Sequence, residues 1–378
     1  MKELEKIIRE AEAARAASKA VALATVVGIE GSAYRLPGAR MLIVDGKWVA
    51  GSISGGCLED DVVLRAREAV AKNETSVALY DTTSDDDVIF GVGLGCKGII
   101  TILIEPIRPP GEGIDFIAFA KTCLEERIAG VAATVIRVEG TTDVKPGARL
   151  VSREGTPVTD IGDPELEKAI EGAMRDQTED TALVTLPLKK GSALVFIERI
   201  VPPTPLVVFG AGHDAMPVVR LAKDLGWHVT LVDHRPAYAT AERFPDADRI
   251  VVGSPKGAHA KLALDSSTLA LVMTHNYLRD LEWLERLLPS PVAYLGLLGP
   301  RRRADQVLAD LKKKGVEPPS NQLGRLYAPV GLDIGSEGPA EVAMSILSEM
   351  QAVMTRHRGG HLRERKVPIH EREETLAT

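Results

Sequence analysis

A glycine-rich turn that ends in a cysteine is the stretch of this chain best suited to chemistry. Residues 51–61 read GSISGGCLEDD, with Cys57 directly after two glycines. Glycine permits positive φ and a close backbone approach, and the apolar spacing of residues 58–72 predicts a helix that begins at this point. The helix dipole favours a thiolate, whereas the acidic residues 59–61 oppose it. Cys57 is therefore a candidate for sulfur chemistry or for binding a soft metal.

A second cysteine, Cys96, lies in a similar setting, because residues 91–98 contain four glycines and a lysine beside the sulfur. Two glycine-flanked cysteines suggest a shared pocket for a soft ligand. The alternative for Cys57 is a small buried hydrophobe at a helix start. Cys123 falls within a helical apolar pattern, so we expect it in a core. Three cysteines in 378 residues fit reduced thiols better than a disulfide framework.

The composition is that of a soluble protein with two or three domains, since 45% of the 378 residues are hydrophobic and 26% are charged. No apolar run approaches the roughly 20 residues that span a bilayer, and residues 1–20 predict an amphipathic helix without the apolar centre of a signal peptide. We expect a cytoplasmic location. The net charge of −7 argues against a general nucleic-acid binder and favours proteins or small molecules as partners.

The elements around the Cys57 turn predict an α/β domain whose polar groups lie in three loops. Residues 21–29 read as a buried strand, and residues 41–44 and 48–50 as a hairpin that turns at Asp45-Gly46. Further strands are expected at 77–80 and 99–104. The loops are the 30–40 segment, the Cys57 turn, and the connection between the last two strands, which contains the acidic and Cys96 segments.

An internal repeat organises the first two hundred residues. The segment ATVV at 24–27 recurs as ATVI at 133–136, and PGAR at 37–40 recurs at 146–149, both 109 positions later. The pair Ile104-Glu105 recurs as Ile197-Glu198 at an offset of only 93. The second copy is thus 16 residues shorter, and we expect the acidic and Cys96 loops to be the missing part. It also has no GGC, so we infer a duplicated unit in which only the first copy kept the chemistry, with chance similarity as the alternative.

A proline-rich segment at 201–205 predicts a domain boundary, and a dinucleotide fingerprint follows it. A strand at 206–209 leads into GAGHDA, a helix at 216–225 and a strand at 228–232 that ends in Asp233. Gly210 and Gly212 would let backbone amides approach a phosphate, and Asp233 would accept from a ribose hydroxyl. Arg235 would instead favour an extra phosphate. The sequence therefore predicts a Rossmann-like doubly wound parallel sheet.

Further polar residues fall where later strands end, at the edge where open α/β sheets bind ligands. His213, His275 and Arg301, the first of three arginines that open a helix, are candidates for binding an anionic group. The alternatives are turn histidines with local partners and a solvated arginine face. A last helix is expected from Pro339 to about Arg356, with Gly338 as its cap.

The expected domains are an α/β domain with the cysteine loops at 1–108, a second, degenerate α/β repeat at 109–200, a Rossmann-like domain at 204–355 and a disordered tail at 358–378.

Taken together, these motifs resemble the XdhC/CoxI family, the accessory proteins of xanthine dehydrogenase and related molybdenum hydroxylases. The segments that carry the resemblance are ATVV at 24–27, GSAYR at 31–35, PGA at 37–39, GGCLE at 55–59, GAGH at 210–213, VDHR at 232–235, TH at 274–275, GLLG at 296–299 and PVGLDIG at 329–335. Ser54, Tyr34, Pro300 and Gly338 depart from the family's usual glycine, proline, serine and threonine.

The resemblance implies a chaperone that binds molybdenum cofactor (molybdopterin), protects it during sulfuration by a cysteine desulfurase and assists its insertion into an apo-hydroxylase. It also implies a homodimer. On this view Cys57, with Cys96, contacts the metal or its sulfur, and Cys57 is the candidate metal ligand. Ser32, Gly55 and Gly56 belong to the cofactor-binding loops. Arg35, His213 and Arg301 hold polar groups of the cofactor.

Two other classes of function stay open on the sequence. One is an NAD(P)-dependent oxidoreductase in which His213 or His275 acts as acid or base, although no lysine, tyrosine or serine set completes a dehydrogenase site. The other is a binding module that recruits the desulfurase and the client without a cofactor. An accessory role is favoured over catalysis.

Overall fold

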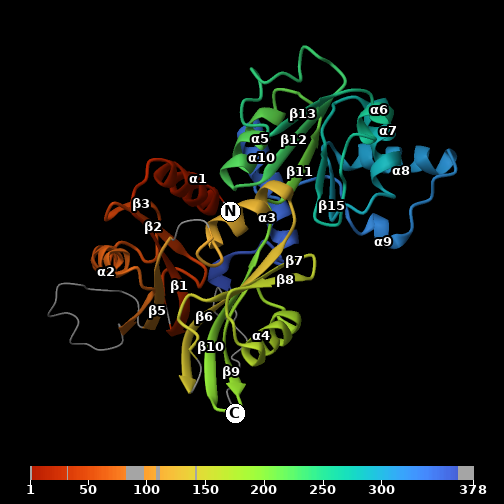
Figure 1. The fold of residues 1–378 in the computed structure, drawn as a ribbon. Helices are drawn as coiled ribbons and strands as arrows, with labels where there is room; N and C mark the ends of the chain where they lie inside the picture. Colours follow the sequence, from red (N-terminus) through yellow and green to blue (C-terminus); the bar gives the residue numbers. More distant parts are fainter. Residues whose placement is uncertain (1, 32, 82–97, 108–110, 141–142, 365–378) are drawn as a thin grey trace. The chain divides into compact units, whose positions relative to one another are not determined.

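The computed structural model describes residues 2–31, 33–81, 98–107, 111–140 and 143–364. The chain divides into two compact units, Met1–Pro203 and Thr204–Thr378, each with its own sheets and buried cores (Figure 1). The division falls in the proline-rich segment.

The first sheet of unit 1 is antiparallel, with the strand order β3-β2-β1-β5-β4. Its strands are β1 (Val21–Gly31), β2 (Arg40–Val44), β3 (Lys47–Gly51), β4 (Ser76–Asp81) and β5 (Gly98–Pro106). Helix α1 (Lys2–Ala16) packs on the face that carries Leu23 and Leu42, and α2 (Glu59–Lys72) packs on the opposite face. Side chains alternate between the two faces along a strand, so the continuous buried runs in β1 and β2 make both faces apolar. The predicted hairpin turn is confirmed, with φ of 49° at Asp45 and 68° at Gly46.

The second sheet repeats the first, with the strand order β8-β7-β6-β10-β9. Its elements are β6 (Gly130–Gly140), β7 (Arg149–Arg153), β8 (Thr156–Thr159), β9 (Thr181–Leu188) and β10 (Gly191–Ile200), with helices α3 (Phe116–Glu126) and α4 (Pro164–Asp176). Individual hydrogen bonds recur as well. Val26 donates to the Ala39 carbonyl at 2.9 Å, and Val135 donates to that of Ala148 at 2.8 Å. The predicted duplication is confirmed.

The shortening of the second copy is divided between two places, which corrects the sequence-based expectation. The offset between copies is 109 from β1 to β6, but it is already 105 from α2 to α4, which begin at residues 59 and 164. It falls to 93 only from β5 to β10. Four of the missing residues therefore come from the turn that holds Cys57 in the first copy. The other twelve come from the loop before β5, whose residues 82–97 lie outside the described part of the chain.

The two copies meet through a shared core and two reciprocal ion pairs. The shared core consists of Val27, Leu103, Ile136 and Phe196, which are equivalent in pairs. Arg40 of the first copy pairs with Glu198 of the second at 2.5 Å, and Arg149 pairs with Glu105 at 2.6 Å. All four of these side chains are buried. Both guanidinium groups also lie over the ring of Phe116, at 4.1 and 5.7 Å from its centre.

Unit 2 contains a six-stranded sheet with the order β13-β12-β11-β14-β15-β16, and every pair in it is parallel. Its strands are β11 (Pro205–Phe209), β12 (His228–Asp233), β13 (Arg249–Val252), β14 (Leu269–Val272), β15 (Tyr294–Leu297) and β16 (Leu326–Tyr327). The chain order reverses between β11 and β14, so the crevice for a ligand is expected there.

Helices cover both faces of this sheet, which confirms the doubly wound fold. Helices α5 (Ala215–Asp224) and α10 (Pro339–Met354) pack on the Leu206 face, and α7 (Tyr277–Leu287) and α8 (Arg301–Lys313) on the Phe209 face (Figure 1). Short helices α6 (Pro255–His259), α9 (Ser320–Leu323) and η2 (Leu362–Glu364) complete the unit. Gly338 caps α10 as predicted, and its amide donates to Glu341 at 3.0 Å.

No helix within the described ranges is long and apolar enough to cross a membrane. Of the tail predicted at 358–378, the structure describes residues up to 364, where η2 lies, and the rest is outside the described part.

Candidate functional site

Cys57 is exposed at the end of a turn that Ser54 holds together from inside. The Ser54 hydroxyl accepts hydrogen bonds from the amides of Gly56, Cys57 and Leu58 at 3.0–3.2 Å. Ser54 thereby fixes the backbone of the residues that lead into helix α2, which begins two residues after Cys57, at Glu59.

Glu59 also stabilises the turn that carries Cys57. Its carboxylate is 2% exposed and accepts hydrogen bonds from the hydroxyl and amide of Ser54, from the Ser52 hydroxyl and from the Leu58 amide. Burial by itself would raise the pKa of Glu59, but the hydrogen bonds from Ser54 and from the backbone outweigh it and hold the pKa below its ordinary value. Glu59 is thus an ionised, buried anchor for the loop that presents Cys57.

The 30–40 loop is tied to this turn through the first helix. Arg35 donates from one nitrogen to both carboxylate oxygens of Glu3 at 2.7 Å, and Glu3 also accepts from the Ser52 amide at 3.2 Å. Tyr34, with 73% of its surface exposed, lies against Gly55, since its ring is 3.8 Å from the place where a Cβ of Gly55 would lie. Arg35 is thus linked, through Glu3, to Ser52 at the start of the turn that carries Gly55, Gly56 and Cys57.

Two other predicted residues of this site, Ser32 and Cys96, lie outside the described residues. Three residues that shape the site were missed as such by sequence reasoning: Glu3, Ser54 and Glu59. Ser54 was noted only as a departure from glycine. Ser54 and Glu59 are five positions apart instead of the three of a capping box, so that pattern could not have found them.

In unit 2, Asp233 is buried at the end of β12, and donors of the protein itself use the hydrogen-bonding capacity of its carboxylate. It accepts from the Ala211 amide at 2.7 Å, from the Arg235 amide at 2.9 Å, and from two guanidinium nitrogens of Arg235 at 3.0 and 2.8 Å. Four donors occupy the four lone-pair directions of a carboxylate. Burial raises the pKa of Asp233, but Arg235 and the two amides lower it to about 2. A ribose hydroxyl would have to displace Arg235 to reach Asp233.

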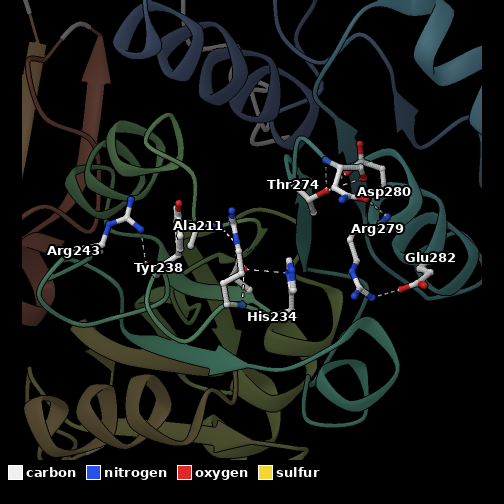
Figure 2. A network of polar contacts seen from close by, with 11 residues as sticks. Ala211, His234, Tyr238, Arg243, Thr274, Arg279, Asp280 and Glu282 are labelled. Carbon is white, nitrogen blue, oxygen red and sulfur yellow. Dashed lines mark hydrogen bonds and ion pairs between the residues drawn. The ribbon is translucent and has the colours of Figure 1, made fainter.

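Beside Asp233, the ring of Tyr238 lies next to two guanidinium groups. Arg235 and Arg243 lie 4.0 and 4.8 Å from the ring centre, and Arg243 also donates to the Tyr238 carbonyl at 3.1 Å (Figure 2). His234 contacts Asp233 at 3.3 Å. In the described part of the chain, Arg243 has no carboxylate partner within 4.0 Å, and its recorded contacts are the Tyr238 carbonyl and the rings of Tyr238 and Phe244.

The glycine-rich loop after β11 carries a carboxylate that the sequence reasoning passed over. The Asp214 carboxylate accepts a hydrogen bond from His275 Nε2 at 2.7 Å, across the point where the strand order reverses. His275 has a left-handed backbone with φ of 56°, and it is exposed, as is His213. Because 61 residues separate the two partners, only the strand order brings Asp214 and His275 together.

The arginine run at the start of α8 serves two different purposes. Arg303 donates to the buried carboxylate of Asp280 at 2.5 and 2.9 Å, and Asp280 also accepts from Thr274 at 2.5 Å (Figure 2). This joins the loop after β14 to helix α8. Arg301 and Arg302 are exposed. Arg301 is therefore accessible to an anion, whereas Arg303 is structural.

No group of three or more histidine, cysteine or acidic side chains with metal-site geometry occurs among the described residues.

Comparison with known proteins covers both units. Residues 206–350 match the XdhC Rossmann domain, and residues 14–81 match the XdhC and CoxI family. The chain is 34% identical over 337 residues to a Bacillus subtilis protein named as a probable component of xanthine dehydrogenase, and the match covers 89% of this chain and 93% of that protein. It is 22% identical to "Molybdenum cofactor insertion chaperone PaoD" of Escherichia coli, over 92% of this chain and 87% of that one. A crystal structure described as a xanthine dehydrogenase from Bacillus halodurans superposes with a TM-score of 0.74 at 28% identity, covering 94% of this chain and 98% of that chain.

Proposed function

Because the chain belongs to the XdhC and CoxI family, we propose that it is an accessory protein that holds molybdenum cofactor for insertion into a xanthine dehydrogenase-type molybdenum hydroxylase. The observation that carries this proposal is the exposed Cys57 on a turn that Ser54 and Glu59 hold fixed. The names of the Bacillus subtilis and Escherichia coli relatives support the same role.

The residues at the turn fit such a cofactor. A thiol is a soft ligand of the kind that binds molybdenum or its terminal sulfur, and the cofactor would supply a metal with an exchangeable oxo or sulfido ligand. Gly55 and Gly56 are exposed, and in the described part of the chain no atom lies within 4 Å of a Cβ position at Gly56. A flat pterin can therefore approach the backbone, with the exposed Tyr34 ring beside it. Arg35 offers guanidinium nitrogens besides the one that Glu3 holds.

The finer parts of the proposal follow from the family resemblance. A cysteine desulfurase sulfurates the cofactor while this chain holds it, Cys96 assists Cys57, and the protein works as a homodimer.

Cys57→Ser is expected to reduce retention of molybdenum and pterin by about tenfold or more, because a ligand or sulfur contact to the cofactor is lost. The protein is purified from a host that makes the cofactor, and molybdenum is measured by elemental analysis and pterin by the fluorescence of its oxidised form. Cys123→Ala is the control, since that thiol is buried in α3. Full retention in Cys57→Ser would contradict the role of Cys57.

We propose in addition that unit 2 binds a nucleotide with a 2′-phosphate, of the NADP type. Asp233 has its acceptors filled by Arg235 and Ala211, so a 2′-hydroxyl finds no acceptor there. A 2′-phosphate would instead meet Arg243 and the exposed side of Arg235, whose side chain is 36% exposed. In Rossmann domains this end of the second strand faces the adenosine ribose.

Adenosine 2′-monophosphate is therefore expected to bind about tenfold to a hundredfold more tightly than adenosine, since a charge-assisted contact contributes about 1.5–3 kcal/mol. Isothermal titration measures both affinities. Arg243→Gln should remove most of the difference, while Arg249→Gln, an exposed arginine on β13, should leave it intact. Equal binding of the two compounds to the unaltered protein would refute the preference.

A further inference from the structure

A dinucleotide fingerprint leaves space for a phosphate beside its second glycine. In this chain the carboxylate of Asp214 occupies that space. The second glycine of such a fingerprint lacks a side chain so that the ligand's pyrophosphate can approach the backbone at the helix start. At Gly212, an added Cβ would lie 2.5 Å from Asp214 Oδ1 and 3.6 Å from His275 Cδ2. The room left by the glycine is occupied by the Asp214–His275 pair.

A hydrogen bond to His275 holds the Asp214 carboxylate beside Gly212, and the carboxylate does not cap helix α5. Asp214 is the N-cap residue of α5, but its side chain makes no capping hydrogen bond. It contacts His275 Nε2 at 2.7 Å instead, from the loop after the neighbouring strand β14. A negative oxygen thus lies where a ligand's 5′-phosphate would lie. The dipole of helix α5 favours either the Asp214 carboxylate or a ligand phosphate at this position. It does not favour both together, because two negative groups in the same space repel each other.

The first glycine of the fingerprint is accounted for within the fold. Gly210 has φ of 123°, and a Cβ there would lie 2.4 Å from the Met273 carbonyl of the adjacent strand's end. Gly210 is therefore required by backbone packing whether or not a ligand binds. Only the space at Gly212 distinguishes an open phosphate site from a closed one.

We propose that Asp214, latched by His275, is a gate that closes the 5′-phosphate position of the unit 2 nucleotide site. The gate rests on the proposed 2′-phosphate nucleotide site, and it opens when the Asp214 side chain leaves Gly212. In the closed state the site binds the adenosine 2′-phosphate part of a nucleotide, and the position for the 5′-phosphate is blocked.

Two probes separate the gate from the site itself. Adenosine 2′-monophosphate needs only the Arg235 and Arg243 end, whereas adenosine 2′,5′-bisphosphate also needs the space at Gly212. With the full-length protein, isothermal titration should give equal affinities for the two probes. With Asp214→Ala, the bisphosphate should bind about tenfold more tightly than the monophosphate, and the affinity for the monophosphate should stay unchanged, which also reports that the fold is intact.

Asp246→Ala is the matched control, because it removes an exposed carboxylate from the same unit and should give no gain. If Asp214→Ala does not fold, Asp214→Asn allows the same comparison, since the amide keeps the volume and removes the charge. A smaller gain is then expected.

The remaining outcomes each overturn the gate. A tenfold preference for the bisphosphate in the unaltered protein shows that the space is already open, although the nucleotide site stands. No preference in Asp214→Ala shows that Gly212 is not a phosphate position, and an equal gain in Asp246→Ala assigns the effect to net charge. Failure of both probes to bind either protein removes the nucleotide site as well, without touching the proposal for Cys57.

Discussion

Glu198→Gln is expected to lower the free energy of unfolding of unit 1 by about 3 kcal/mol or more, because it leaves Arg40 buried with its charge unpaired. The two side chains are only 6% and 8% exposed, so water cannot replace the lost carboxylate. Cys123 is fully buried in unit 1, and its alkylation in increasing urea, read by peptide mass spectrometry, follows unfolding of this unit alone. The midpoint should fall by about 1 M or more.

The matched control is Glu139→Gln, which breaks an exposed pair with Arg137 on the same strand and should cost about 0.5 kcal/mol or less. Glu105→Gln, in the reciprocal pair, should resemble Glu198→Gln. Replacing Arg40 and Glu198 together by methionine should recover much of the loss, since no buried charge then remains. A Glu198→Gln midpoint no lower than that of Glu139→Gln would show that the pair does not hold the copies together.

Glu59→Gln is expected to destabilise unit 1 by about 1–3 kcal/mol at pH 7. The glutamine NH₂ group is a donor, and it would face the N–H donors of Ser54 or Leu58 where a carboxylate oxygen now accepts from them. It should also change the pH dependence. The pKa of Glu59 is lowered in the folded state, so its ionisation stabilises the fold above the ordinary value of 4.5. That contribution is lost as the pH falls through the lower folded pKa.

The measurement is the urea midpoint of Cys123 modification between pH 3 and 7, with 2,2′-dithiodipyridine as the reagent, because alkylation needs the thiolate and is too slow at acid pH. The difference between the unaltered protein and Glu59→Gln should shrink toward acid pH, and Cys57 should react faster with iodoacetamide in the variant at neutral pH. Glu68→Gln, an exposed residue on the same helix, should change neither. A constant difference across the pH range would contradict an ionised Glu59 anchor.

Much of the architecture followed from local patterns. The repeated ATV and PGAR segments predicted two copies of one unit, and hydrophobic spacing with turn residues placed most strands and helices within a few residues. The glycines before Cys57 and the apolar spacing after it likewise predicted a thiol near a helix start. These features depend on neighbours in the chain, which periodicity and turn chemistry report directly.

The partners of the polar groups could not be predicted in the same way. Arg40 has two equivalent candidates, Glu105 and Glu198, and only the packing of one copy on the other decides between them. Asp214 gave no signal beyond an acidic residue in the fingerprint, because His275 follows a different strand. Asp233 was expected to face a ribose, but the side chain of Arg235, two residues later, folds back and pairs with it. The residue types alone do not decide whether Arg235 points toward Asp233 or away from it.

The reciprocal ion pairs bear on the ancestry of unit 1. Equivalent residues that pair crosswise are the mark of a two-fold interface between identical protomers, where one arginine and one glutamate make both contacts. The Arg40–Glu198 and Arg149–Glu105 pairs preserve that pattern within one chain. Unit 1 is thus built like a two-fold dimer within one polypeptide, the arrangement expected from fusion of two protomers. The two halves differ in the turn before α2 and α4, which is longer in the first copy, so one polypeptide presents one thiol-bearing turn.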